Sequence, residues 1–157
     1  MKHMKQYVLA LMLSFFSFAV FAATTDATAE VTKAGQAWQQ AIASRNAATI
    51  AALYSPHALL YATFDNMIDD HAALLEYFKK ITLNENLQVT FDKQHVRVYG
   101  DVGINSGLYT FSYKQDEKEV KVPARYTFVY LHKGNKWLII EHHSSVLPKP
   151  PAANNSI

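Results

Sequence analysis

Apolar residues recur with helical spacing between residues 30 and 81, and they alternate with polar residues in the second half of the chain. Within residues 30–44, apolar side chains fall three or four positions apart, which predicts a helix with one buried face. Shorter patterns of the same kind predict two further helices, over residues 47–54 and 71–81. These helices should cover one side of a sheet.

After residue 86, β-branched and aromatic residues alternate with polar ones in four runs that turn-forming residues separate. The predicted strands cover residues 87–99, 101–114, 120–132 and 136–145, and a shorter strand is predicted over 58–63. Helices followed by consecutive strands predict an α+β fold with an antiparallel sheet.

The last two predicted strands flank Gly134-Asn135, a pair typical of a tight hairpin turn. With regular pairing from this turn, Thr127 lies opposite His142. Side chains alternate across a strand, so the hairpin has two faces. The first face has a polar end made of Arg125, Thr127, His142 and Ser144. The second face carries an apolar row made of Tyr126, Phe128, Tyr130, Trp137 and Ile139.

The polar end of the first face predicts a ligand pocket. Arginine offers a rigid fork to a carboxylate or phosphate, and histidine can donate, accept or shuttle a proton. The candidate ligand-binding residues are Arg125, Thr127, His142, Ser144, Tyr54, Tyr61 and Tyr109. If the ligand is an anion, its affinity should rise as the pH falls through about 6.5 and His142 gains charge. The alternative is structural: Arg125 pairs with a carboxylate, and His142 is a hydrogen-bonded core residue.

The apolar row on the second face predicts self-association. An apolar surface of this breadth on a monomer requires a partner surface, which favours a twofold dimer through Tyr126, Phe128, Tyr130, Trp137 and Ile139. In the alternative arrangement, the helices cover this row and the face with the polar end lies outside.

The N-terminal segment predicts export. Lys2 and Lys5 precede an apolar run, and Val20-Phe21-Ala22 offers the small residues that a signal peptidase reads. We expect a periplasmic or secreted protein; an uncleaved anchor is the alternative. The predicted organisation is a signal peptide over 1–22, a frayed N-terminus over 23–29, a single domain over 30–147 and a disordered tail over 148–157.

Composition excludes several classes of function. The chain contains no cysteine, which rules out thiolate chemistry and cysteine-based zinc sites. It has 15 basic and 13 acidic residues, and two of the basic ones fall in the predicted signal peptide, so no nucleic-acid or membrane-surface partner is implied. His142 and His143 are adjacent in a predicted strand and point to opposite faces, which disfavours a shared metal ion. No metal or cofactor is predicted, since phosphate-loop and catalytic-triad motifs are also absent.

Two parts of the sequence resemble known proteins. WQQA at residues 38–41 and TIAALYSPHA at 49–58 resemble the opening of the nuclear transport factor 2-like (SnoaL-like) superfamily, although His57 stands where that superfamily typically has an acidic residue. RYTFVY at 125–130 and WLIIEHHSS at 137–145 are similar to bacterial relatives of the calcium/calmodulin-dependent protein kinase II association domain. The resemblance implies a cone: a curved antiparallel sheet around helices, with a cavity at its wide end and dimers formed through the sheet.

We therefore expect an exported ligand-binding or oligomerisation module without kinase activity, whose partners are a second copy and a small polar or anionic molecule. The alternative is a cofactor-independent lyase, isomerase or cyclase in which His142, the candidate catalytic residue, acts with a cavity tyrosine or aspartate. A carboxylate that faces Arg125 and His142 across an enclosed pocket would favour the enzyme. A pocket without a carboxylate would favour binding.

Overall fold

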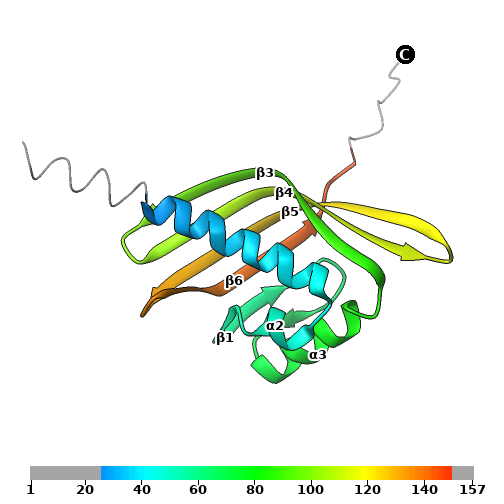
Figure 1. Cartoon of the computed structure of the whole chain (residues 1–157), viewed down its shortest axis with the longest axis horizontal. Helices are drawn as coiled ribbons and strands as arrows, with labels where there is room; N and C mark the ends of the chain where they lie inside the picture. Colours follow the sequence, from blue (N-terminus) through cyan, green and yellow to red (C-terminus); the bar gives the residue numbers. More distant parts are fainter. Residues whose placement is uncertain (1–25, 150–157) are drawn as a thin grey trace, which may run out of the picture.

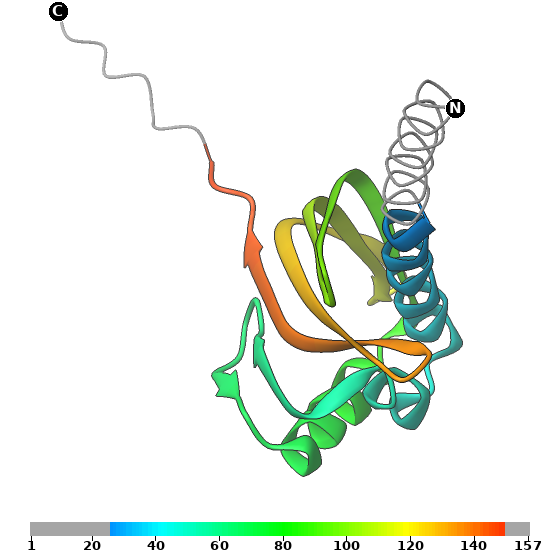
Figure 2. The ribbon, with the colours of Figure 1, turned by 90° about the vertical axis from the view of Figure 1, so that its left-hand side faces the viewer.

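A long N-terminal helix lies across one face of a curved sheet, and two shorter helices lie beside its C-terminal end (Figures 1 and 2). The computed structural model describes residues 26–149. The predicted signal peptide, residues 1–22, and most of the predicted tail lie outside the described residues. The N-terminal helix covers residues 26–44, so the prediction of a frayed segment is wrong for residues 26–29. Alanines at positions 27 and 29 favour helix there, and Val31, two residues after Ala29, is fully buried.

The sheet has six strands in the order β2-β1-β6-β5-β4-β3. Their bounds are β1 Tyr54–Tyr61, β2 Met67–Ile68, β3 Glu85–Tyr99, β4 Val102–Gln115, β5 Lys118–Lys133 and β6 Lys136–Val146. Strands β3 to β6 form the predicted antiparallel succession, and the α+β cone fold is confirmed. However, β1 runs parallel to β6, so the sheet is mixed rather than wholly antiparallel. The long connection through β2, α3 and β3–β5 permits this parallel pairing.

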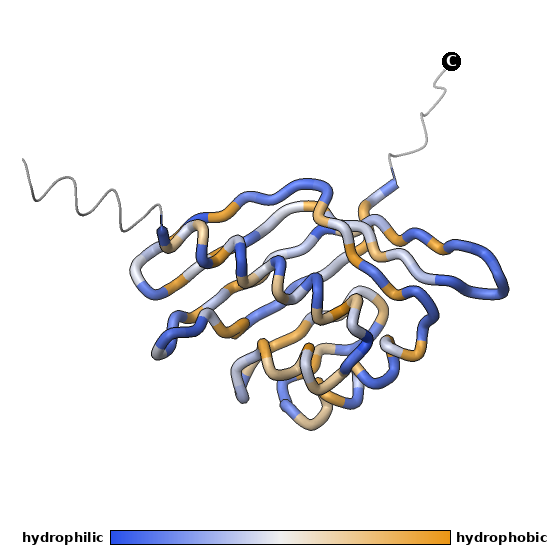
Figure 3. Tube along the Cα trace, in the orientation of Figure 1, coloured by the Kyte–Doolittle hydropathy of each residue, from blue (hydrophilic) through white to orange (hydrophobic). Residues whose placement is uncertain are grey.

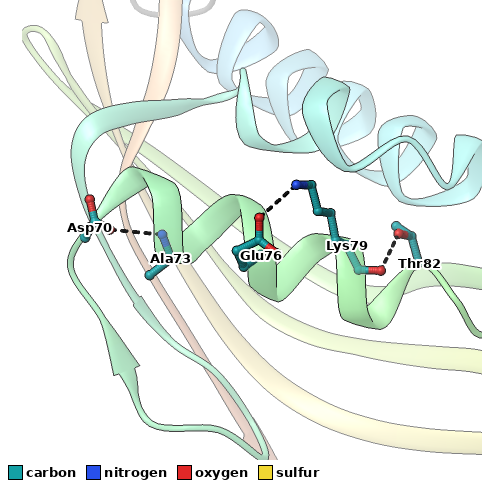
Figure 4. A network of polar contacts seen from close by, with 5 residues as sticks. All are labelled: Asp70, Ala73, Glu76, Lys79 and Thr82. Atoms are coloured by element: carbon teal, nitrogen blue, oxygen red, sulfur yellow. Dashed lines mark hydrogen bonds and ion pairs between the residues drawn. The ribbon is translucent and has the colours of Figure 1, made fainter.

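Helix α3 (His71–Ile81) has the bounds that the sequence predicts because both of its ends carry local capping signals. The Asp70 carboxylate accepts a hydrogen bond from the backbone N–H of Ala73 at 3.0 Å (Figure 4). It also accepts one from the backbone N–H of Ala72 at 3.3 Å. At the other end, the Thr82 hydroxyl donates to the Phe78 carbonyl at 2.7 Å. Helix α2 (Ala47–Ala51) is shorter than predicted, since Tyr54 already belongs to β1.

A β-bulge in β6 decides which side chains face the helices. From the hairpin turn up to the pair Tyr130–Ile139, the strands follow the predicted register. The next pair is Val129–Glu141, which leaves Ile140 as an extra residue in β6. A single extra residue reverses the side to which every following side chain of the strand points.

Beyond the bulge, the predicted register is wrong by one residue. Thr127 lies opposite His143 instead of His142, and Arg125 lies opposite Ser145 instead of Ser144. Arg125 and Thr127 therefore share the outer face of the sheet with His143, while His142 points inward and is 3% exposed. The predicted grouping of Arg125 with His142 on one face does not form.

The inner face of the sheet carries the apolar row of the last hairpin, and the N-terminal helix covers it. Tyr126, Phe128, Tyr130 and Ile139 are at most 3% exposed, and the indole of Trp137 donates to Glu30 of the helix at 2.9 Å. Trp38 from the same helix packs on Phe128, with ring centroids 4.9 Å apart. The prediction of a dimer interface through this row is therefore wrong, since these side chains form the core.

Apolar and polar residues alternate along the strands of the sheet and along the helix that crosses it (Figure 3). The N-terminal helix buries Val31, Trp38, Ala41 and Ile42, which lie on one helical face. Within residues 26–149, no helix has the length and apolar content needed to span a membrane.

Candidate functional site

A small cavity lies between the inner face of the sheet and the helices, beside His142. It has a volume of about 20 Å³, which is enough for one water molecule or one ligand atom of similar size. The N-terminal helix, β1 and its following loop, α3, β4 and β6 all contribute side chains to this inner cavity. They are Trp38, Leu60, Ala62, Thr63, Tyr77, Phe78, Ile81, Tyr109, Phe111, His142 and Ser144.

A wider hollow adjoins the inner cavity and opens toward solvent. This vestibule has a volume of about 140 Å³ and shares Thr63, Tyr77, Ile81 and Phe111 with the inner cavity. Its remaining lining is mostly apolar and consists of Phe64, Asn84, Leu87, Tyr113 and Val122. The two spaces together, here called the pocket, combine an apolar entrance with a polar inner end.

The pocket carries no formal charge at neutral pH. Among the described residues that line it, none is Asp, Glu, Lys or Arg. Burial lowers the pKa of His142 to about 3, with a smaller contribution from the nearby charge of His143, so the ring is neutral. Burial also raises the pKa of Tyr77 to about 12 and that of Tyr109 well above its ordinary value. The expectation that His142 becomes charged below pH 6.5 and strengthens anion binding is therefore wrong.

His142 lies at the centre of a series of buried hydrogen bonds. Its Nδ1 lies 2.9 Å from the Tyr54 hydroxyl, and its Nε2 lies 3.4 Å from the Tyr109 hydroxyl. On the core side, the Trp38 indole N–H donates to the Tyr54 oxygen at 3.0 Å. Both ring nitrogens of a buried, neutral histidine are thus paired, which offsets the cost of removing them from water.

The same series continues from Tyr109 to the pocket. The Tyr109 hydroxyl donates to Ser144 Oγ at 2.6 Å, and Ser144 Oγ is in turn hydrogen-bonded to Thr63 Oγ1. Thr63 lines both the inner cavity and the vestibule. The six side chains from Trp38 to Thr63, here called the polar chain, connect the centre of the core with the pocket.

The structure brings together four of the seven predicted ligand-binding residues, because Tyr54, Tyr109, His142 and Ser144 all belong to the polar chain. Arg125 and Thr127 lie on the outer face, and the bulge in β6 turns His142 and Ser144 away from them to the inner face. Tyr61 also lies there and packs against the ring of His143, with centroids 6.1 Å apart. In residues 26–149, no group of three or more His, Asp or Glu side chains could hold a metal ion.

Two members of the polar chain, Trp38 and Thr63, were not predicted from the sequence as site residues. Trp38 had a signal, since it lies in the middle of the apolar face of its helix, but that signal indicates packing rather than hydrogen bonding. Thr63 had none, because it follows β1 in an irregular segment whose path depends on the rest of the fold.

The sequence profile of the calcium/calmodulin dependent protein kinase II association domain matches residues 27–148. An association domain of this kind from Xanthomonas campestris has a solved structure that is 33% identical, with a TM-score of 0.72 over 77% of this chain and 88% of that one. The chain belongs to the association domain family. Among curated proteins, none matches this association domain significantly.

More distant structures share the fold of this association domain. The hub homology domain of the corresponding kinase from Chlamydomonas reinhardtii is 23% identical, with a TM-score of 0.63 over 78% of this chain and 99% of that one. A dehydratase of the nuclear transport factor 2-like family from Streptomyces avermitilis is 17% identical, with a TM-score of 0.74 over 80% and 99% of the two chains. At these identities, the likeness concerns the fold alone.

The outer face of this association domain carries an apolar centre that no helix covers within residues 26–149. Side chains from both the N-terminal helix and α3 line the inner cavity, so both helices lie on the inner side of the sheet (Figure 1). On the opposite side, Ile104 of β4 lies directly across from Val129 of β5, and Val102 lies across from Leu131. These four side chains are partly exposed.

Proposed function

We propose that the protein is a self-associating module in which each copy holds a small, uncharged ligand in its pocket. The observation that carries self-association is the uncovered apolar centre of the outer face. Membership of the association domain family supports it. The proposed interface lies on the face of the sheet opposite to the one predicted from the sequence. As in that prediction, the two copies associate through their sheets.

The geometry of the outer face suits packing against a second copy. Ile104 and Val129 lie on the two central strands of the antiparallel part of the sheet, with charged residues such as Arg97 and Glu141 farther out on the neighbouring strands. An apolar centre inside a polar rim is the usual anatomy of a protein interface. A twofold axis through this centre would place the same apolar side chains of both copies against one another, sheet on sheet.

The test is the mass of the purified full chain in solution, measured by light scattering coupled to size exclusion at micromolar concentration. We expect an oligomer for the wild type and a monomer for Ile104→Glu, because the substitution places a charge at the centre of the interface. Ala43→Glu introduces the same charge at an exposed position of the N-terminal helix and should leave the oligomer intact.

A monomeric wild type would refute self-association. An oligomer that persists in Ile104→Glu would instead exclude the outer face as its interface. Near-ultraviolet circular dichroism of each variant tests whether the core aromatic residues keep their packing.

The pocket supports binding better than carboxylate-assisted catalysis. An isomerase or dehydratase of the predicted kind needs a carboxylate base at the reacting atom. None of the described residues that line the inner cavity or the vestibule supplies one, and Arg125 cannot provide an anion fork from the outer face. The apolar vestibule and the neutral polar chain favour an uncharged ligand.

We also propose that the protein acts outside the cytoplasm. The proposal rests on the charged start, the apolar run and the small residue Ala22 at the expected cleavage position.

A further inference from the structure

We infer from the direction of the polar chain that the pocket selects an uncharged ligand with a hydrogen-bond acceptor, such as a carbonyl oxygen, which a hydroxyl group at the pocket end of the chain binds. This inference rests on the proposed ligand-binding function and names the class of ligand. Its basis is the set of donors and acceptors from Trp38 to Thr63.

The core end of the chain fixes the direction of its hydrogen bonds. An indole N–H can only donate, so the Tyr54 oxygen accepts from Trp38. The single proton of the Tyr54 hydroxyl is then available to His142 Nδ1, 2.9 Å away. A neutral imidazole that accepts at Nδ1 carries its proton on Nε2.

The hydrogen bonds on the other side of His142 agree with this tautomer. The Tyr109 hydroxyl donates its single proton to Ser144 Oγ, so it cannot also donate to His142. His142 Nε2 must therefore be the donor in its contact with the Tyr109 oxygen. Both neighbours of the ring thus assign the proton to Nε2, and the four hydrogen bonds from Trp38 as far as Ser144 all run toward the pocket.

At the pocket end of the polar chain, one hydroxyl proton has no acceptor within the polar chain. The six side chains contribute one N–H or O–H proton each, and the five contacts between them use five protons. The remaining hydroxyl proton belongs to Thr63 or Ser144, and both residues line the inner cavity. An acceptor atom in the cavity satisfies this donor, whereas an apolar group would leave it unpaired at a cost in free energy.

The dimensions of the pocket complete the description of the ligand. The inner cavity has room for one atom of the size of a carbonyl oxygen, in the position that a water molecule could otherwise occupy. The vestibule can take an apolar body of modest size against Phe111, Tyr113 and Leu87. A carboxylate does not suit the site, since no described cation lines the pocket to offset its desolvation.

Three probes of nearly equal size test this specificity by calorimetry and by chemical-shift changes at Thr63 in the full-length protein. Acetophenone has a carbonyl oxygen, α-methylstyrene has a methylene group in its place, and benzoate has a charged carboxylate. We expect acetophenone to bind roughly 3- to 10-fold more tightly than α-methylstyrene, which corresponds to one net hydrogen bond. Benzoate should bind most weakly.

The three possible failures can be told apart. Equal affinities for acetophenone and α-methylstyrene would overturn the inference and leave ligand binding intact. The tightest binding by benzoate would overturn the requirement for an uncharged ligand. If no probe binds or shifts Thr63, the proposed ligand-binding function is wrong, and the inference is wrong with it.

A second measurement tests the direction of the hydrogen bonds in the polar chain without any ligand. Nitrogen-15 NMR distinguishes a protonated ring nitrogen from an unprotonated one, and we expect His142 to carry its proton on Nε2 alone. In Trp38→Phe the fixed donor is lost, so both tautomers should be populated. Trp137→Phe removes an indole that donates to Glu30 outside the chain, and it should leave the tautomer unchanged. A proton on Nδ1 in the wild type would overturn the inference.

Discussion

Acid should destabilise this protein through the buried side chain of His142. Its pKa is about 3 in the folded protein because of burial, whereas a histidine in an unfolded chain has a pKa of about 6.5. The unfolded chain therefore takes up this proton first as the pH falls. The stabilising contribution is fully present above pH 6.5 and is lost as the pH falls from 6.5 toward 3.

The size of the effect follows from these two pKa values. Within this interval, each pH unit lowers the free energy of unfolding by about 1.4 kcal/mol. Between pH 7 and pH 4.5 the loss from His142 should amount to about 2.5 kcal/mol, since little is lost above 6.5. A loss of this size is a large part of the 5–15 kcal/mol that is typical of a folded domain.

Urea unfolding at pH 7.0 and pH 4.5 measures this loss, and two variants separate it from other titrating groups. His142→Gln has no proton to gain, so its free energy of unfolding should fall by about 2.5 kcal/mol less than that of the wild type between the two pH values. The neighbouring His143 is exposed on the outer face, and His143→Gln should behave nearly as the wild type does.

The comparison does not depend on how stable His142→Gln is at neutral pH, because only the change with pH is compared. An equal loss in the wild type and in His142→Gln would refute the reasoning, since it would show that His142 is protonated in the folded protein near its ordinary pKa.

Two further predictions concern the N-cap of α3 and the proposed cleavage of the signal peptide. Asp70→Ala should lower the free energy of unfolding by about 1 kcal/mol in urea titrations, because the N-cap of α3 is lost, whereas Asp69→Ala removes an exposed carboxylate that caps nothing and should have almost no effect. The exported protein should begin at Ala23 when its intact mass is measured, and soluble exported material that retains residues 1–22 would contradict the proposed cleavage.

The elements of this fold could be predicted from the sequence because their signals are local. Helix α3 has its cap at Asp70 directly before its first turn, and the strands from β3 to β6 show the alternation of half-buried strands. The partners of β1 could not be predicted in this way. Its parallel pairing with β6 joins residues some 80 positions apart, and no local pattern encodes such a contact.

The bulge at Ile140 could not be predicted for a different reason. Trp137, Leu138, Ile139 and Ile140 are four consecutive apolar residues, so hydropathy is satisfied in either register. His142 and His143 are adjacent and of the same residue type, so the sequence does not show which of them points inward. Both faces of the hairpin are partly apolar, which is also why the covered face could not be identified from the hairpin alone.

The candidate site was predictable only in part. His142 and its tyrosine neighbours stood out by residue type, but the neutral state of the ring depends on complete burial, which no sequence pattern reports. Thr63, which ends the polar chain, lies in an irregular segment and gave no indication of its position.

Strand β6 contributes side chains both to the pocket and to the outer face of the sheet, which is the proposed association surface. His142 points into the polar chain and the adjacent His143 points to the outer face, so one peptide unit separates the pocket from the association surface. A ligand that shifts this strand acts on both surfaces at once. Thermodynamic linkage then requires reciprocity: a ligand that strengthens assembly must bind more tightly to the assembled form, by the same factor.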